Sequence, residues 1–347
     1  MASPPKNFAI SETIIDPTKM VSFYRAGGLF EHYQNQIHGD NIYAAWADNS
    51  DSPAPFFNML PVFRRGEIKH CKDRTKLKFH DQIKIPYPRY SSQTFIAEYT
   101  LSVNPTDPGN LNMCMNCFDI GLPAPFYTEN LISASFDHGK TWTTKNWNTV
   151  VPGLVMASDV RQIFDKFGNG WNCAMAVPVE TGSPPLAFAL AVSIDGGLTY
   201  KPVGSIPPPA GFDYGFDYPQ MAFGSDGSDG FGLYVTVDLI DNASNTLVPS
   251  IIFTPVLGRG NFGTPVLYQL STLTNLVAWG NPLVNDKGDV YIAYINFPAP
   301  GVGFANLLVT IPGGIIGISN GNIMGPFLGN FAQHSSRYPN LDASYAD

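Results

Sequence analysis

The sequence predicts an all-β fold, a β-propeller of four-stranded blades, with five blades preferred and six as the alternative. Three observations support this prediction: a composition rich in turn residues and aromatics, a short motif that occurs twice, and strand starts that recur at a nearly constant interval. The chain has 347 residues, of which 33 are Gly, 30 are Pro and 13% are aromatic. Frequent Gly and Pro with many aromatic residues favour short strands joined by many turns.

The charge balance argues against several classes of partner. Only 14% of the residues are charged and the net charge is −8, with no basic cluster larger than 63–65 or 69–78. A nucleic-acid groove needs a concentrated positive field, so we expect no nucleic-acid partner. No apolar run approaches the length of about 18 residues that a membrane span needs. The first six residues lack the apolar segment of a signal peptide, so we expect a protein that is intracellular or delivered by a non-standard route.

The repeated motif is S-x-D-x-G-x-T followed by an aromatic residue, and its two copies begin 58 residues apart. The Asp side chain can accept hydrogen bonds from the backbone N–H groups just ahead of it and so close a turn. The Gly supplies a positive φ, and the aromatic ring packs under the turn. We therefore expect these aspartates to make turns rather than to catalyse. The motif residues are Ser135, Asp137, Gly139, Thr141 and Trp142 in the first copy and Ser193, Asp195, Gly197, Thr199 and Tyr200 in the second.

A longer repeat marks where successive units begin. Its markers are Glu98, Asp159, Tyr218, Asn281 and Tyr338, at intervals of 61, 59, 63 and 57 residues. A strand-like segment starts near each marker and ends at Asn, Asp or Gly, as before a turn. Regular units of this length favour a propeller over a sandwich.

The two ends of the chain suggest how such a propeller would close. Residues 39–48 look like the second strand of a blade that lacks its first, and the last unit, 338–347, stops after a single strand. Pairing the two would build one blade from both termini and remove exposed sheet edges. We expect residues 1–36 to form an arm or plug and residues 37–347 a single propeller domain; alternatively, residues 1–36 and 67–90 hold a sixth blade or a plug.

The two motif copies resemble the Asp boxes of sialidases and their relatives. Unit starts such as 103–111 are also similar to those of sialidase-like repeat proteins, and the resemblance covers about residues 37–347, most strongly 91–201. It implies a propeller fold. In a working sialidase it would imply three arginines around a sialate carboxylate, a Tyr–Glu nucleophile pair and an Asp acid/base. The family's early Arg-x-Pro motif is missing at its usual place, because Arg337-Tyr338-Pro339 lies near the other end.

The candidate binding face lies at the starts of the inner strands. Arg89, Arg161 and Arg337 could converge there as an anion site, or they could be solvated or paired with the acidic residues at the same level. No catalytic residue is assigned among them. The binding-face candidates are Arg89, Glu98, Asp159, Arg161, Asp217, Tyr218, Asn281, Arg337 and Tyr338.

Nothing in the sequence predicts a cofactor or a metal site. Cys114 and Cys117 form a lone CxxC in an apolar run, where residues three apart point to opposite faces, so we expect buried thiols. The acidic stretch 224–230 lacks the Glu that a calcium loop needs and reads as a hairpin turn.

Three functions remain open from the sequence. The first is a non-catalytic propeller that binds a glycan or a protein at its mouth. The second is an exo-acting glycoside hydrolase of sialidase type. The third is a structural component of a larger oligomeric assembly, for which the low charge and many aromatic residues argue.

Overall fold

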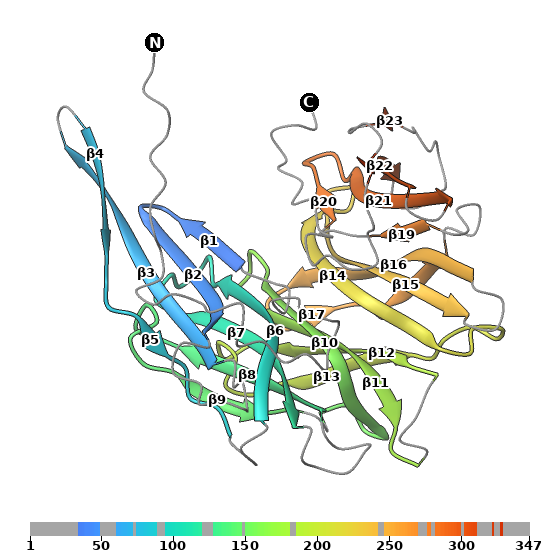
Figure 1. Ribbon diagram of the computed structural model, residues 1–347, viewed down its shortest axis with the longest axis horizontal. Helices are drawn as coiled ribbons and strands as arrows, with labels where there is room; N and C mark the ends of the chain where they lie inside the picture. The colour runs from blue at the N-terminus through green and yellow to red at the C-terminus, as the bar shows by residue number, and fades with distance from the viewer. Residues whose placement is uncertain are drawn as a thin grey trace.

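The strands of the protein form five antiparallel sheets, each made of strands that follow one another in the chain (Figure 1). The computed structural model describes residues 34–48, 60–71, 74–88, 94–119, 128–147, 150–180, 185–241, 246–269, 276–278, 282–299, 302–310, 321–322 and 327–328. Over these residues the fold is all-β, as the sequence predicts. No helix in this part of the chain is long and apolar enough to span a membrane.

The strand bounds show how regular the sheets are. The first sheet holds β1 (Gln34–His38), β2 (Asn41–Asp48), β3 (Leu60–Cys71), β4 (Arg74–Phe79) and β5 (Ile83–Lys84). The second holds β6 (Thr94–Val103), β7 (Leu111–Asp119), β8 (Thr128–Ser135) and β9 (Thr143–Asn146). The third holds β10 (Leu154–Phe164), β11 (Gly170–Pro178), β12 (Ala187–Ser193) and β13 (Lys201–Ile206). The fourth holds β14 (Gly215–Ser225), β15 (Phe231–Asp241), β16 (Thr246–Gly258), β17 (Asn261–Phe262) and β18 (Val266–Gln269). The fifth holds β19 (Leu276–Ala278), β20 (Leu283–Val284), β21 (Val290–Ala299), β22 (Val302–Thr310), β23 (Gly321–Asn322) and β24 (Phe327–Leu328).

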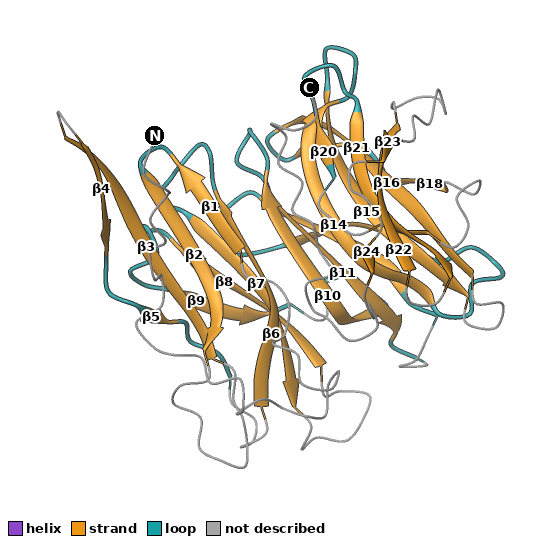
Figure 2. Ribbon diagram, turned by 45° about the horizontal axis from the view of Figure 1, so that its top comes forward, coloured by secondary structure: helices purple, strands orange, loops and turns teal. Residues whose placement is uncertain are grey.

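Apolar clusters join each sheet to the next. Tyr43 and Phe63 of the first sheet pack with Ile96 and Leu101 of the second, all at most 1% exposed. Further clusters join the second sheet to the third, the third to the fourth and the fourth to the fifth. Figure 2 shows the sheets side by side in chain order. Each sheet is therefore buried on both faces where it has two neighbours, which explains the nearly continuous apolar runs in β11, β12 and β15.

The prediction that β2 lacks its first strand is wrong. Within the first sheet β1 pairs with β2 through Gln34↔Ala45 and His38↔Asn41. A tight turn at Gly39, with φ +56°, joins the two strands. A local hairpin closes a much shorter loop than pairing of the chain ends would, so its entropic cost is lower.

Residues 67–84 also belong to the first sheet, as the ends of β3 with β4 and β5, so this segment adds no sixth blade. The C-terminal unit 338–347 lies outside the described residues. Extensive packing between the first and fifth sheets, which would close a ring, is not observed among the described residues. Figure 1 shows these two sheets at opposite sides of the molecule.

Candidate functional site

Three inner strands carry the same irregularity at the same place. The pairing of β6 with β7 shifts between Ala97 and Thr100, so that two residues lie opposite one. The pairing of β10 with β11 shifts in the same way between Ser158 and Arg161, and that of β14 with β15 between Asp217 and Gln220. Each shift is a β-bulge, a feature that re-aims side chains and occurs often next to active sites.

The first bulge residue of each strand is one of the predicted unit markers. Glu98, Asp159 and Tyr218 have φ values of 56°, 53° and 55°. This left-handed region suits glycine, and a residue with a side chain pays roughly 1–2 kcal/mol to adopt it. All three positions hold a polar or aromatic side chain in place of glycine, despite that cost. The bulges are therefore candidates for a functional site whose geometry depends on the strained backbone.

The bulges bring two carboxyl groups from neighbouring sheets to one N–H group. The backbone N–H of Tyr218 lies 3.0 Å from Asp217 Oδ1 and 3.4 Å from Asp159 Oδ2. Asp159 belongs to the third sheet and Asp217 to the fourth, so the pair exists only when these sheets pack together. Asp159 is 9% exposed and Asp217 is partly buried.

The two carboxyl groups have pKa values that move in opposite directions. Burial raises the pKa of Asp217 well above its usual range, and the adjacent Asp159 and Asp238 raise it further. Burial also acts to raise the pKa of Asp159, but hydrogen bonding with Asp217 and Glu98, and the charge of Arg161, outweigh burial and lower it. These shifts favour a protonated Asp217 beside an ionised Asp159.

Arg161 supplies the positive charge of this cluster. Its side chain is 2% exposed, and its guanidinium carbon lies 5.5 Å from the centre of the Tyr218 ring. One guanidinium nitrogen donates a hydrogen bond of 2.9 Å to the carbonyl of Val160. Burial lowers the pKa of Arg161, but Tyr218, Asp159 and Glu98 raise it by more, so the group stays charged.

Two site residues were not predicted from the sequence. Asn116 on β7 donates to Glu98 and accepts a 3.4 Å hydrogen bond from the N–H of Val160, which links two bulges. Asp238 lies opposite Asp217 in the β14–β15 register and is 2% exposed. Both are polar residues inside apolar second strands, and that contrast is the signal that could have identified them.

Four of the nine binding-face candidates lie outside the described residues: Arg89, Asn281, Arg337 and Tyr338. The structure brings the other five together around the bulges. Convergence of three arginines therefore stays a prediction.

The motif aspartates form turns on hydrogen bonds within their own loops. Asp137 accepts hydrogen bonds of 2.9 Å from the N–H of Thr141, 2.7 Å from its hydroxyl and 2.9 Å from the hydroxyl of Ser135. Asp195 accepts the equivalent bonds from Thr199 and Ser193 at 2.9, 2.5 and 2.8 Å. Burial acts to raise the pKa of each, and these donors outweigh it, so both pKa values are lowered. Trp142 donates to the carbonyl of Gly139 at 2.9 Å, which places the ring under the turn.

Three of the cysteines and the acidic stretch have described surroundings. Cys114, Cys117 and Cys173 are buried and free, and Cys114 and Cys117 belong to different core clusters. Burial raises the pKa of Cys114 to about 12, so it remains a thiol. In the 224–230 stretch, Asp226 accepts from the N–H groups of Ser228 and Gly230. Over the described ranges, no three His, Cys, Asp or Glu side chains group as a metal site requires.

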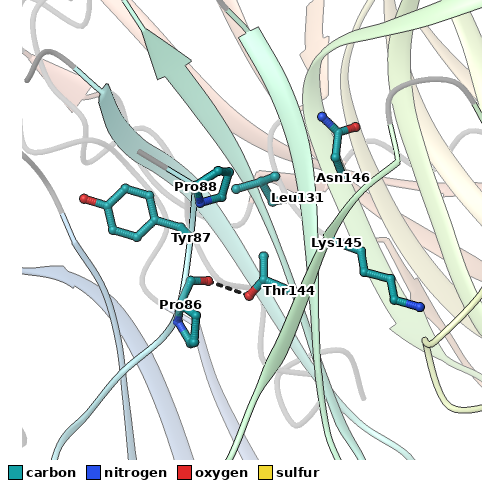
Figure 3. A pocket seen from close by; sticks show the side chains of 7 residues that line it. All are labelled: Pro86, Tyr87, Pro88, Leu131, Thr144, Lys145 and Asn146. Carbon is teal, nitrogen blue, oxygen red and sulfur yellow. Dashed lines mark hydrogen bonds between the residues drawn. The ribbon is translucent and has the colours of Figure 1, made fainter. Parts of the chain in front are cut away.

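A surface pocket of about 340 Å³ lies elsewhere, beside the outer strand β9 (Figure 3). The hydroxyl of Thr144 donates a 2.5 Å hydrogen bond to the carbonyl of Pro86 across it. Lys145 extends away from Tyr87 and donates to the carbonyl of Leu198 at 2.8 Å. The pocket thus lacks the paired carboxyl groups of the bulge site. Its lining residues are Pro86, Tyr87, Pro88, Leu131, Thr144, Lys145 and Asn146.

No protein-family model matches the sequence, and no curated protein matches it. Solved structures do resemble the fold. Trypanosoma rangeli sialidase in complex with the inhibitor DANA is 12% identical, with a TM-score of 0.49, over 86% of this chain and 50% of that chain. Penicillium chrysogenum α-L-arabinanase complexed with arabinobiose is 11% identical, with a TM-score of 0.45, over 84% of this chain and 80% of that chain. Phanerochaete chrysosporium exo-β-1,3-galactanase is 9% identical, with a TM-score of 0.43, over 81% of this chain and 60% of that chain. This chain spans about half the length of the sialidase, and at these identities the likeness concerns the fold alone.

Proposed function

We propose that the protein is a five-bladed β-propeller that binds a neutral carbohydrate at the inner-strand bulges. The observation that carries the proposal is the backbone N–H of Tyr218, which lies within hydrogen-bond distance of both Asp159 and Asp217, with Asp159 and Tyr218 themselves at positive φ. Strained backbone and carboxyl groups with divergent pKa values are both commoner at functional sites than elsewhere.

The chemistry of the cluster suits hydroxyl groups. An ionised Asp159 accepts hydrogen bonds from sugar hydroxyls, and a protonated Asp217 can donate one. Hydrogen bonds to a charged acceptor are stronger than those between neutral groups. Tyr218, partly buried beside them, adds an aromatic surface for the apolar face of a sugar ring.

The charge of the cluster favours a neutral sugar over a sialate. Arg161 is buried and its charge interacts with Asp159 and Glu98. Asp238, beside Asp217, adds a further acidic group at the same place. A ligand carboxylate would therefore meet more negative than positive charge from the described residues, which disfavours it.

Glycan-array screening followed by calorimetric titration tests this proposal. We expect binding to a neutral oligosaccharide that Asp159→Asn weakens about tenfold or more, which corresponds to about 1.4 kcal/mol. Asp229→Asn is the matched control, because Asp229 is exposed on a turn, and it should leave affinity unchanged. Binding of sialosides alone, of a protein alone, or of any ligand with equal affinity by the Asp159→Asn variant would contradict the proposal.

A second candidate function, glycoside hydrolysis, is favoured by the opposite pKa shifts of the same pair. A carboxyl group that keeps its proton beside one that has lost it can serve as an acid and a base. Asp217 would then protonate the leaving group and Asp159 would take a proton from the attacking water.

The test of hydrolysis is turnover of aryl glycosides of neutral sugars. We expect Asp217→Asn to lower kcat by about 100-fold or more, since it removes the proton donor. The same variant should still bind the sugar, because the amide can donate a hydrogen bond. An absence of turnover by the wild-type protein would leave binding alone as the proposed function.

A further inference from the structure

Three neighbouring sheets place an exposed apolar side chain at the end of their third strand. Ser135, Ser193 and Val256 are each 1% exposed, and each pairs with the first residue of the second strand in its sheet. The residue that follows each of them is therefore structurally equivalent in the three sheets. These residues are Phe136, Ile194 and Leu257, with exposed fractions of 48%, 44% and 65%.

The fold alone does not account for these apolar side chains. Single exposed apolar residues are common on protein surfaces, but a group of them on one surface indicates a site of contact. The hydrogen bonds that close the two motif turns are made by Ser, Asp and Thr side chains and by backbone groups. The turns therefore need no particular side chain at Phe136 or Ile194.

The three turns touch one another in chain order, so the apolar side chains form one row. A Cβ at Gly196 would lie 2.6 Å from the ring of Phe136, so the first turn contacts the second. A Cβ at Gly260 would lie 3.4 Å from Ile194, so the second turn contacts the third, which carries Leu257. We call Phe136, Ile194 and Leu257 the apolar row.

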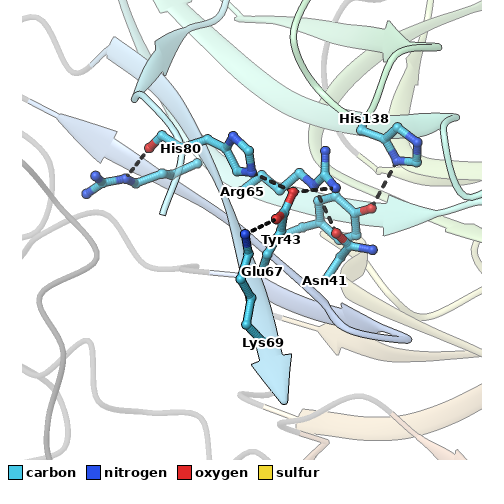
Figure 4. A network of polar contacts seen from close by, with 8 residues as sticks. Asn41, Tyr43, Arg65, Glu67, Lys69, His80 and His138 are labelled. Carbon is cyan, nitrogen blue, oxygen red and sulfur yellow. Dashed lines mark hydrogen bonds and ion pairs between the residues drawn. The ribbon is translucent and has the colours of Figure 1, made fainter. Parts of the chain in front are cut away.

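The first turn of the apolar row is held by contacts with the strands beneath it. The N–H of His138 donates to the carbonyl of Gly109 at 3.0 Å. Figure 4 shows the His138 ring directed toward the hydroxyl of Tyr43, whose oxygen lies 3.3 Å from Nδ1. Tyr43 is fully buried in the first sheet. The backbone that carries Phe136 is therefore fixed with respect to the first two sheets.

Cations lie between the members of the apolar row. Lys145 of β9 donates to the carbonyl of Leu198 in the second turn at 2.8 Å. Arg259 of the third turn donates to the carbonyl of Ile194 at 2.7 Å. Both cations are exposed, as is Lys140 of the first turn. Positive charges and apolar side chains therefore alternate along this surface.

The three turns and the outer strands that follow them differ in charge from the rest of the chain. Residues 136–146, 194–206 and 257–269 hold four cations, all exposed, and two acids, both half-buried. The two carboxylates accept hydrogen bonds within their own turns. The rest of the chain holds 16 Lys and Arg against 26 Asp and Glu. The four cations are Lys140, Lys145, Lys201 and Arg259, and the two acids are Asp137 and Asp195.

The turns between first and second strands, at the same end of the sheets, lack this positive excess. They carry exposed Asp107, Asp229 and Asp286 against exposed Lys166 and Lys287. The excess of exposed positive charge therefore belongs to the outer turns, and an anionic surface would make its contact there.

A lipid interface fits this combination of features better than a protein partner does. The members of the apolar row protrude from turns, and a protein partner would need a separate hollow for each. A lipid interface takes in protruding apolar side chains one by one, and such binding grows with the apolar area buried and with attraction to anionic lipids. Lys and Arg near the surface supply that attraction.

We propose that the apolar row and its cations bind the surface of a membrane that contains anionic phospholipids. Phe136, Ile194 and Leu257 enter the headgroup region, and the neighbouring cations pair with lipid phosphates. The proposal is independent of any ligand at the bulges, because it uses none of the bulge residues.

Co-sedimentation with vesicles at about 0.1 M salt tests this contact. We expect binding to vesicles of equimolar phosphatidylcholine and phosphatidylserine, and much weaker binding to phosphatidylcholine alone. Leu257→Ser should lower the partition coefficient about tenfold, because it removes a buried apolar side chain from the contact. Val179→Ser is the matched control and should leave binding unchanged. Val179 is 57% exposed at the other end of the third sheet.

A charge reversal tests the cations. Lys140→Glu should lower the affinity for the phosphatidylserine vesicles about tenfold or more. Lys84→Glu, at an exposed position in the first sheet, makes the same change in net charge and should leave the affinity unchanged. Salt of about 1 M should weaken binding of the wild type, because the screening length falls to about 3 Å.

A fluorescent side chain in the apolar row tests insertion. Compared with the wild type, Phe136→Trp should add fluorescence that brominated acyl chains quench, whereas the fluorescence that Val179→Trp adds should not be quenched. Equal quenching of the two variants would overturn the proposal. So would a wild-type protein that binds no phosphatidylserine vesicles or binds both kinds of vesicle equally, unchanged binding by Leu257→Ser and Lys140→Glu, or binding of an acidic protein at these residues without any binding of vesicles.

Discussion

Two groups of aspartates in this protein have the same side chain and opposite electrostatics. Asp137 and Asp195 lie in the turns between the third and fourth strands of their sheets, where N–H and hydroxyl donors from the same loop surround each carboxylate. Asp159 and Asp217 lie at bulges of inner strands and share a single backbone N–H between them.

The difference shows what makes a carboxyl group structural or reactive. In the turns, several N–H and hydroxyl donors bind each carboxylate and lower its pKa, so the ionised carboxylate holds the loop together. At the bulges, two carboxyl groups share one backbone N–H, and burial with neighbouring Asp159 and Asp238 raises the pKa of Asp217. A carboxyl group of the second kind can keep its proton and donate a hydrogen bond to a ligand.

The largest expected effect that separates the two groups is the loss of a turn carboxylate. Asp195→Ala removes the acceptor of four hydrogen bonds, from Ser193, Leu198 and both donors of Thr199. We expect the free energy of unfolding to fall by about 2–3 kcal/mol, measured by urea denaturation at pH 7. Asp229→Ala, at an exposed turn position, should cost less than about 0.5 kcal/mol. Equal losses for the two variants would show that the turn bonds do not stabilise the fold.

The second prediction concerns pH and has opposite signs in the two groups. The folded pKa of Asp217 is raised, so its protonated form contributes stability fully below the unfolded pKa of about 3.9, and that contribution is lost as pH rises through the folded value. Asp217→Asn cannot ionise, and we expect it to be more stable than the wild type by about 1–2 kcal/mol at pH 7 and equal to it near pH 3.

Asp195→Asn tests the opposite sign in the turn group. The folded pKa of Asp195 is lowered, so its contribution is present above about pH 3.9 and lost as pH falls through the folded value. We expect this variant to be less stable than the wild type at pH 7, with the difference fading in acid. Unfolding free energies of both variants across this pH range check the signs; destabilisation of both at pH 7 would refute the contrast.

The sequence predicts the turn group far better than the bulge group, for a physical reason. The turn motif is local: Ser135 and Asp137 interact within a few residues, so spacing alone gives the hydrogen-bond partners. The recurrence interval also marks Glu98, Asp159 and Tyr218, but it says nothing of their backbone conformation. Their positive φ depends on strand register, which tertiary packing decides.

The residues of the bulges were predicted to share one face, but their specific contacts could not be predicted. Asp159 and Asp217 approach each other through the packing of two sheets, and Asp238 comes beside them through pairing of β14 with β15. The prediction that β2 lacks its first strand was wrong for a related reason. A local turn at Gly39 supplied the missing strand, and the apparent gap reflected only a short first strand that begins at Gln34.

The smallest expected effect tests whether the backbone at the bulges is strained. At Glu98, with φ 56°, both Glu98→Gly and Glu98→Ala delete the carboxyl group that Asn116 contacts, so that loss cancels between them. Glycine reaches this φ without steric cost, whereas alanine pays roughly 1–2 kcal/mol. Glycine loses about 0.5–1 kcal/mol more backbone entropy on folding. We therefore expect the glycine variant to be the more stable by about 0.5–1 kcal/mol in urea denaturation.

At Lys201 in β13, an ordinary strand position, the order should reverse and alanine should be the more stable. Alanine more stable at both positions would mean that the bulge conformation costs nothing, and the strain argument for a functional site would fail.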